Sequence, residues 1–254
     1  MKTVFLDKDG TLVEDVPYNV DPARISLKPG AREGARALAA AGYALAVVTN
    51  QSGIARGYFT PEALGPVAGQ LQDLLGVRFA GFFYCPHHPE GVVARYAIDC
   101  DCRKPRPGMI LNAARAIGAD LAASWMIGDI LHDVEAGNRA GCRTVLIDNG
   151  GETEWVGGPY RAPTLVCRDL AEAAGLIVAL PSSSPGRGGG VGGQITCRGQ
   201  VIRRSPACEA SRWSRSDGGG VSPLVSRGHP SDALRAPPPL PGEELFPRKQ
   251  RTPA

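Results

Sequence analysis

Residues 4–15 read VFLDKDGTLVED and place two aspartates directly after a short apolar run. The run belongs to an expected strand over residues 3–6, and Asp7 and Asp9 follow it with only Lys8 between them. Carboxylates this close together repel each other unless a cation or a shared proton holds them. An Asx-type turn that closes a strand would give the same pattern, so the meaning of this stretch depends on the chain around it.

Short apolar runs alternate with helical patterns as far as residue 180. The run YALAVVT is continuously apolar, which is typical of a strand covered on both faces of a parallel sheet. Thr60 is the expected N-cap of one helix, with Pro61 in its first position. The expected strands are residues 3–6, 43–49, 79–85, 123–129 and 142–148, and the expected helices are 31–42, 60–76, 107–118, 130–141 and 169–180. This alternation predicts a doubly wound, Rossmann-like α/β domain with a mainly parallel sheet over residues 1–180.

The composition changes at Pro181, where PSSSPGRGGGVGGQ begins. Residues 1–180 carry a net charge of −3 and residues 181–254 a net charge of +6, so the basic excess belongs to the second segment alone. That segment has few large apolar residues to offset the entropy of ordering, and we expect a disordered tail over 181–254. A basic arm for nucleic acid or membranes is the functional alternative, but its arginines are scattered.

The chain has no apolar run of about 18 residues, the length that a membrane-spanning helix needs. Its first residues, MKTVFLDKDG, carry charges where a signal peptide needs an apolar stretch. We therefore expect a cytoplasmic protein without a membrane partner. In that compartment the seven cysteines indicate reduced thiols or metal ligands rather than disulfides.

Polar side chains follow three of the expected strands, at the edge where ligands bind in open parallel sheets. Asp7 and Asp9 follow the first strand, Thr49 ends the second, and Asp129 ends the fourth. The three carboxylates would form an oxygen-rich site suited to Mg²⁺. One carboxylate could attack phosphorus and another could transfer protons, while Thr49 and Lys104 hold the phosphoryl oxygens.

A second group of candidate ligands lies in the stretch CPHHPEG…AIDCDCRKP, residues 85–105. Cys85 and His87 form one pair, and Cys100 and Cys102 form another after 12 intervening residues. Three thiolates and one imidazole suit a structural, tetrahedral Zn²⁺ site; a loop of reduced cysteines with a surface histidine is the alternative. The neighbouring His88 is not expected to be a ligand. Because the loop runs directly into Arg103 and Lys104, its folding would be linked to phosphate binding.

Four segments, DKDGT, VVTNQSG, RKP and IGDILHD, occur in this order and resemble the four motifs of the haloacid dehalogenase superfamily of phosphohydrolases. The resemblance implies that Asp7 is the nucleophile and Asp9 the general acid and base. It further implies that Thr49 and Lys104 bind the transferred phosphoryl group. Asp129 would complete the Mg²⁺ site, to which Asp9 would contribute its backbone carbonyl.

One helical turn beyond Asp129 lies Asp133. Its side chain could contact and orient Asp129 without binding the metal itself, or it could be a solvated helix residue. The residues alone leave both interpretations open.

The zinc loop, the lack of a large cap and the run TNQSGIARG resemble, within that superfamily, the D-glycero-D-manno-heptose-1,7-bisphosphate phosphatase family. The resemblance covers residues 1–180. It implies removal of the 7-phosphate from this small phosphorylated sugar during ADP- or GDP-heptose precursor synthesis for lipopolysaccharide, by an enzyme taken by default as a monomer. The substrate-binding residues that it implies are Asn50, Gln51, Ser52, Arg103 and Asp15.

Ile130 departs from the family pattern, which has lysine directly after the metal-binding aspartate. This leaves the exact substrate and the preferred anomer open. Histidinol-phosphate phosphatases share the motif set and a similar zinc loop, and are the alternative. A nucleic-acid end-processing phosphatase that uses the basic tail, and a non-catalytic zinc scaffold, fit the sequence less well.

Overall fold

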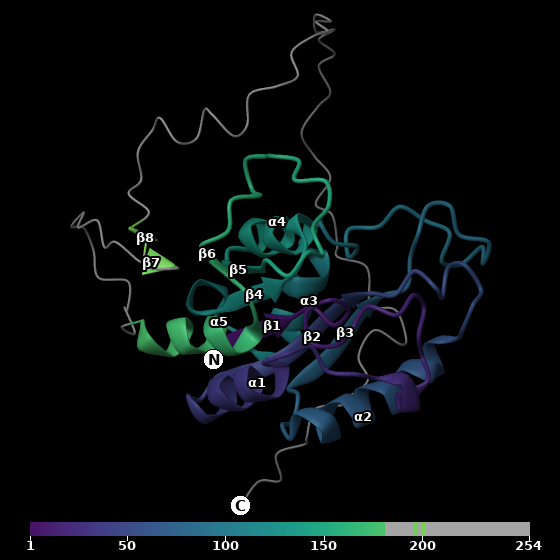
Figure 1. Ribbon diagram of the computed structural model, residues 1–254. Helices are drawn as coiled ribbons and strands as arrows, with labels where there is room; N and C mark the ends of the chain where they lie inside the picture. Colours follow the sequence, from purple (N-terminus) through teal and green to yellow (C-terminus); the bar gives the residue numbers. More distant parts are fainter. Residues whose placement is uncertain (181–195, 198–199, 202–254) are drawn as a thin grey trace, which may run out of the picture. The chain divides into compact units, whose positions relative to one another are not determined.

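Six parallel strands form one sheet in the order β3-β2-β1-β4-β5-β6 (Figure 1). The computed structural model describes residues 1–180, 196–197 and 200–201. The strands are β1 (Thr3–Leu6), β2 (Ala44–Asn50), β3 (Gly81–Cys85), β4 (Trp125–Gly128), β5 (Arg143–Ile147) and β6 (Leu165–Cys167). The order runs outward from β1 in both directions, so the sheet is doubly wound and the predicted fold class is confirmed.

Helices cover both faces of this sheet (Figure 1). On one face lie α1 (Ala31–Ala40), α2 (Leu64–Leu75) and α5 (Leu170–Ala179), and on the other lie α3 (Gly108–Ile117) and α4 (Leu131–Ala140). Alternating strand residues supply the two cores: Val4 and Leu6 pack with the first group of helices, whereas Phe5 packs with the second. All three side chains are fully buried, as expected for a strand covered on both sides.

Two local features differ from the sequence expectation. The edge strand β6 was not predicted, since it has only three residues and its middle side chain is exposed. The helix expected over 60–76 is divided into a short 3-10 helix, Pro61–Ala63, and α2. Thr60 is the N-cap of the 3-10 helix and Pro61 its first residue, as expected, although the Thr60 side chain makes no capping hydrogen bond. Pro66 is tolerated as the third residue of α2, where a backbone N–H would have no partner inside the helix.

Two further short strands, β7 (Thr196–Cys197) and β8 (Gln200–Val201), pair antiparallel with each other. The rest of the predicted disordered tail, residues 181–254, lies outside the described residues. None of the helices in the described part of the chain has the length and apolar character needed to cross a bilayer.

Strand register brings the predicted site residues to one edge of the sheet. Leu6, the last residue of β1, pairs with Val47 of β2 and with Ile127 of β4. β1 and β4 therefore end at nearly the same level, and β2 continues past them to Asn50, which places Thr49 just beyond the end of β1. The backbone N–H of Asp7 donates to the carbonyl of Ile127 over 2.9 Å, which fixes the first carboxylate beside the end of β4.

Close packing of α1 against α5 depends on Gly34. A Cβ atom at this position would lie 2.5 Å from the carbonyl carbon of Leu170, far inside van der Waals contact with a backbone that cannot rotate away. The two helices therefore approach each other only because this residue has no side chain. Gly175 of α5 is exposed, and a Cβ there would meet no atom within 4 Å in the described structure.

These two glycines form a matched pair for a stability test. We expect Gly34→Ala to lower the free energy of unfolding by about 1–3 kcal/mol, because it overpacks the helix contact. Gly175→Ala should raise that free energy by about 0.5–1 kcal/mol, because alanine is the better helix former and has space. Urea unfolding of both variants measures the difference; equal effects of the two substitutions would contradict the close-packing account.

Candidate active site

A cavity of about 580 Å³ opens at the carboxyl edge of the sheet, over the ends of β1, β2 and β4. It gathers most of the residues that the sequence predicted for catalysis and substrate binding. Those that line it are Asp7, Asp9, Asp15, Thr49, Asn50, Gln51, Ser52, Lys104 and Asp129. Segments that are far apart in the chain therefore converge on one hollow.

Lys104 is the electrostatic centre of this cavity. Its Nζ lies 2.5 Å from Asp7 Oδ1 and 2.5 Å from Asp133 Oδ1, and it donates to the Val48 carbonyl over 3.0 Å. Burial alone would favour a neutral amine, but the carboxylates of Asp133 and Asp7 raise the pKa of Lys104 above its usual value. The ammonium group is therefore charged at any physiological pH.

Three buried carboxylates surround this ammonium group. Oxygens of Asp7, Asp129 and Asp133 lie within 4.8 Å of one another. Burial, together with the neighbouring carboxylates, raises the pKa of Asp7 well above its usual range and that of Asp129 to about 7. When all three carboxylates are ionised, the single lysine leaves an excess of negative charge. A divalent cation would balance this charge, and the oxygen donors suit Mg²⁺.

Asp133 is thus a member of the cluster and not a solvated helix residue, since it is fully buried. The sequence could not decide this, because a position one turn into a helix can face the site or the solvent. Its Oδ2 also accepts from the backbone N–H of Ile130 over 3.4 Å, at the start of α4.

The carboxylate of Asp9 lies apart from this cluster. Lys8 Nζ forms a close ion pair with Asp9 Oδ1, and Gln51 Nε2 donates to Asp9 Oδ2 over 3.1 Å and to Thr49 Oγ1 over 2.9 Å. The Asp9 side chain is 29% exposed, more than those of the three clustered aspartates, so it can meet a substrate oxygen or a water molecule. Lys8 was not predicted as a site residue, although its place between the two aspartates was visible.

Glycines allow the backbone to approach these carboxylates. Gly10 has a φ of +80°, and a Cβ atom there would overlap Asp129 Oδ2. A Cβ at Gly128 would overlap Asp133 Oδ2 in the same way. Side chains at these two positions would therefore displace the carboxylates from the cluster.

Asn50 fixes the loop that carries Lys104. Its Nδ2 donates to the Lys104 carbonyl over 3.2 Å, and its Oδ1 accepts from the Lys104 backbone N–H over 3.1 Å. Arg103 points elsewhere: its Nη1 donates to the His87 carbonyl over 3.4 Å, and it is not among the described residues that line the cavity. Of the predicted substrate-binding residues, Arg103 is the one that the structure does not bring into the cavity.

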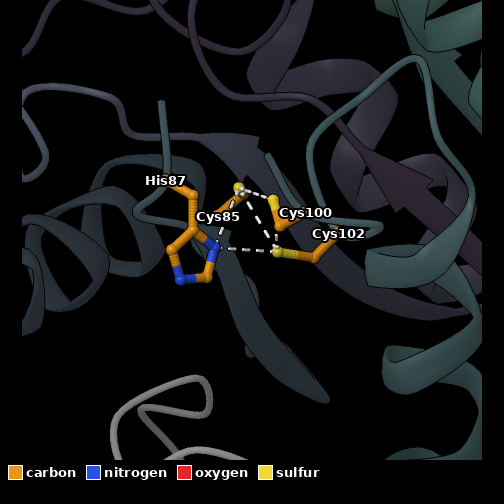
Figure 2. A group of neighbouring side chains, drawn as sticks. All are labelled: Cys85, His87, Cys100 and Cys102. Atoms are coloured by element: carbon orange, nitrogen blue, oxygen red, sulfur yellow. Dashed lines mark hydrogen bonds between the residues drawn. The ribbon is translucent and has the colours of Figure 1, made fainter. Parts of the chain in front are cut away.

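The predicted zinc ligands converge at the start of the same loop (Figure 2). Cys102 Sγ lies 3.3 Å from each of Cys85 Sγ, Cys100 Sγ and His87 Nδ1, and Cys85 Sγ lies 3.5 Å from Cys100 Sγ. The four donor atoms fit one tetrahedral ion. His88 is separate, with its Nε2 3.3 Å from Arg56 Nη2, as expected for a residue outside the ligand set.

The thiols of this cluster lie close enough to perturb one another's pKa values. Hydrogen bonds from Cys102 and Cys85 lower the pKa of Cys100, and the same contacts raise the pKa of Cys102 and that of Cys85, the latter to about 12. A bound Zn²⁺ would stabilise all three thiolates. The five cysteines in residues 1–180 form no disulfide.

The loop between β5 and β6 contributes residues that the sequence did not reveal. Asn149 Nδ2 donates to the Gly10 carbonyl over 2.8 Å, and Glu152 Oε2 accepts from the Leu131 backbone N–H over 2.7 Å. Ile130 has no polar side chain with which to cap α4, so Glu152 caps this helix from a distant part of the chain. Further along the loop, Arg161 Nε donates to Glu135 Oε2 over 2.7 Å.

Residues 101–173 match the family of HAD-hydrolase-like proteins. Over 184 residues the chain is 39% identical to the D-glycero-beta-D-manno-heptose-1,7-bisphosphate 7-phosphatase of Pasteurella multocida (strain Pm70), which covers 71% of this chain and 99% of the relative. The protein of the same name from Escherichia coli (strain K12) is 42% identical over 151 residues, or 58% of this chain and 79% of the relative.

Two solved structures resemble the fold. A HAD-like phosphatase of Mesorhizobium loti has a TM-score of 0.61 at 39% identity, covering 70% of this chain and 85% of that one. The D,D-heptose 1,7-bisphosphate phosphatase of B. bronchiseptica, solved with magnesium and phosphate, has a TM-score of 0.57 at 32% identity. The match covers 70% of this chain and 98% of that one. The chain is therefore a phosphoric monoester hydrolase of the haloacid dehalogenase type and belongs to the D-glycero-beta-D-manno-heptose-1,7-bisphosphate 7-phosphatase family.

Proposed function

We propose that the protein is a Mg²⁺-dependent phosphatase that removes the 7-phosphate of D-glycero-β-D-manno-heptose 1,7-bisphosphate, and that residues 1–180 carry this activity. The observation that supports it best is the buried ion pair of Asp7 with Lys104 beside two further carboxylates. The β anomer is favoured because relatives that are about 40% identical carry it in their names. Such a reaction would serve the synthesis of ADP- or GDP-heptose precursors.

In the first step of the proposed reaction, Asp7 is the nucleophile. A carboxylate oxygen of Asp7 attacks phosphorus and forms an aspartyl-phosphate while the bond to the sugar oxygen breaks. Asp9 donates a proton to that leaving oxygen, for which its partly exposed carboxyl group is suitably placed. Lys104 and the Thr49 hydroxyl would stabilise the negative charge on the phosphoryl oxygens.

The second step reverses the proton transfer. Asp9, now a carboxylate, removes a proton from a water molecule that attacks the aspartyl-phosphate, and the bond between Asp7 and phosphorus breaks. Lys8 and Gln51 hold Asp9 in one orientation for both steps.

Two metal ions complete the proposal. Asp7, Asp129 and the backbone carbonyl of Asp9 would hold Mg²⁺, with Asp133 in contact with the same cluster, and this ion supplies positive charge that orients the phosphate. Cys85, His87, Cys100 and Cys102 would hold a structural Zn²⁺.

The substrate assignment is tested by phosphate release from the full chain with Mg²⁺. We expect kcat/KM for the β-heptose 1,7-bisphosphate to exceed that for the α anomer and for histidinol phosphate by about tenfold or more, since one correctly placed contact is worth that factor. A preference for histidinol phosphate would contradict the substrate while leaving the chemistry of Asp7 in place. The control is Asp7→Asn, which should abolish turnover of every substrate and leave the thermal midpoint of unfolding no lower.

Magnesium should stabilise the protein more at high pH. Burial raises the pKa of Asp129 to about 7 in the absence of a cation, so protonation favours the folded state below that pH and this contribution is lost as pH rises through it. In Mg²⁺-free buffer we therefore expect the increase in Tm on adding Mg²⁺ to be larger at about pH 8 than at about pH 6. Differential scanning fluorimetry measures it. Asp129→Asn should remove most of this pH dependence. An equal increase in Tm on adding Mg²⁺ at both pH values in the unmodified protein would contradict the role given to Asp129.

Zinc binding should determine whether Lys104 is in place. We expect Cys102→Ser to lower the zinc content measured by atomic emission and to reduce kcat/KM by about ten- to hundredfold, because the loop that carries Lys104 starts at this cluster. Cys142→Ala is the matched control, since Cys142 is a buried cysteine outside the cluster. This variant should keep the zinc bound by the four clustered residues. Full activity of a zinc-depleted Cys102→Ser variant would disprove the link.

A further inference from the structure

The cavity offers few cations to a second anionic group of the substrate. Among the described residues that line it, the cationic side chains are Lys8, Lys28 and Lys104. Lys104 is bound between two aspartates and Lys8 is paired with Asp9, and their side chains are only 3% and 5% exposed. Both serve the end of the cavity where phosphorus reacts, which leaves Lys28 for any other anion.

Lys28 is held in a way that allows exchange of its partner. Its Nζ lies 3.1 Å from Glu14 Oε2, and the side chains are 21% and 48% exposed. An ion pair this exposed is weak in water. The backbone at Lys28 is fixed instead, since its N–H donates to the Leu12 carbonyl over 3.0 Å. The ammonium group can therefore leave Glu14 for a more highly charged ligand without moving the chain.

The start of α4 offers no positive charge that could compete. Ile130 lines the cavity at the start of this helix, and its side chain brings no charge. The neighbouring N–H of Leu131 is occupied by the carboxylate of Glu152. Although burial opposes ionisation, hydrogen bonds from Leu131 and other backbone N–H groups lower the pKa of Glu152, so it is an anion. A second phosphate would be repelled from this helix terminus.

We propose that Lys28 binds the phosphate that is not hydrolysed. The incoming dianion displaces the carboxylate of Glu14 from the Lys28 ammonium group. Lys28 is thereby the residue that determines preference for a bisphosphate over a monophosphate. This assignment rests on the proposed function, because only a bisphosphate substrate carries the second group.

The test compares kcat/KM for heptose 1,7-bisphosphate with that for heptose 7-phosphate, which lacks the 1-phosphate. We expect Lys28→Met to lower this ratio about ten- to hundredfold, the worth of one charge-assisted hydrogen bond, and Lys28→Arg to retain it. Inhibition by the product heptose 1-phosphate should weaken by a similar factor in Lys28→Met. Lys2→Met is the matched control: it removes the same charge from an exposed lysine whose Nζ lies 4.2 Å from the Tyr43 ring, and Lys2 does not line the cavity.

Glu14→Gln adds a test in the opposite direction. Freed from its partner, Lys28 should bind the second phosphate more tightly, so the ratio should rise. In the Lys28→Met background the same change should have no effect, which a double-mutant cycle measures. If Glu14→Gln still raises the ratio in the Lys28→Met background, Glu14 acts by simple repulsion of the phosphate. That result would overturn the proposed exchange of partners at Lys28.

Two further outcomes separate this inference from the proposed function. If Lys28→Met keeps normal activity on the bisphosphate and an unchanged ratio of the two kcat/KM values, the assignment of Lys28 is wrong. The same holds if only Arg103→Met lowers that ratio. Neither result would affect the proposed function. No activity of the unmodified protein on either heptose phosphate would overturn the proposed function and, with it, this assignment.

Discussion

The site depends on keeping three carboxylates together inside the protein. Asp7, Asp129 and Asp133 would separate or take up protons if nothing opposed their charge, and Lys104 alone neutralises only part of it. Much of the surrounding structure holds this arrangement in place. Asn50 fixes the backbone of the lysine, glycines make room for the carboxylates, and the cluster of Cys85, His87, Cys100 and Cys102 lies at the start of the loop that carries the ammonium group. The unbalanced negative charge is what makes the cavity a place for a cation and a phosphate.

Much of this could be predicted from the sequence, and the reason is the parallel sheet. Once strands and helices alternate, every strand ends at the same edge, so Asp7, Thr49 and Asp129 had to meet. The convergence of the three cysteines with His87 was predictable because these residues lie at short spacing in one stretch of the chain. Four motifs in order then indicated a phosphatase of the haloacid dehalogenase type, and the relatives named above agree with that family.

Other features depended on information that one sequence does not contain. The orientation of Asp133 is set by how α4 packs, and that of Arg103 by the path of the loop that follows Cys102. Glu152 lies 21 positions from the N–H that it caps, and no local pattern connects the two. The strand β6 is too short to show a period. In each case a long-range contact determines the outcome.

The loop between β5 and β6 is hydrogen-bonded to the rest of the protein near both ends and is exposed to solvent in its middle. Asn149 and Glu152, near its start, contact Gly10 and the first turn of α4, and near its end Arg161 is bonded to Glu135 of α4. Between these anchors residues 153–160 are exposed to solvent. Extra sequence inserted there would leave both anchors intact while adding structure beside the mouth of the cavity. In evolutionary terms, this loop is a place where a chain of this fold can acquire a lid without disturbing the chemistry beneath it.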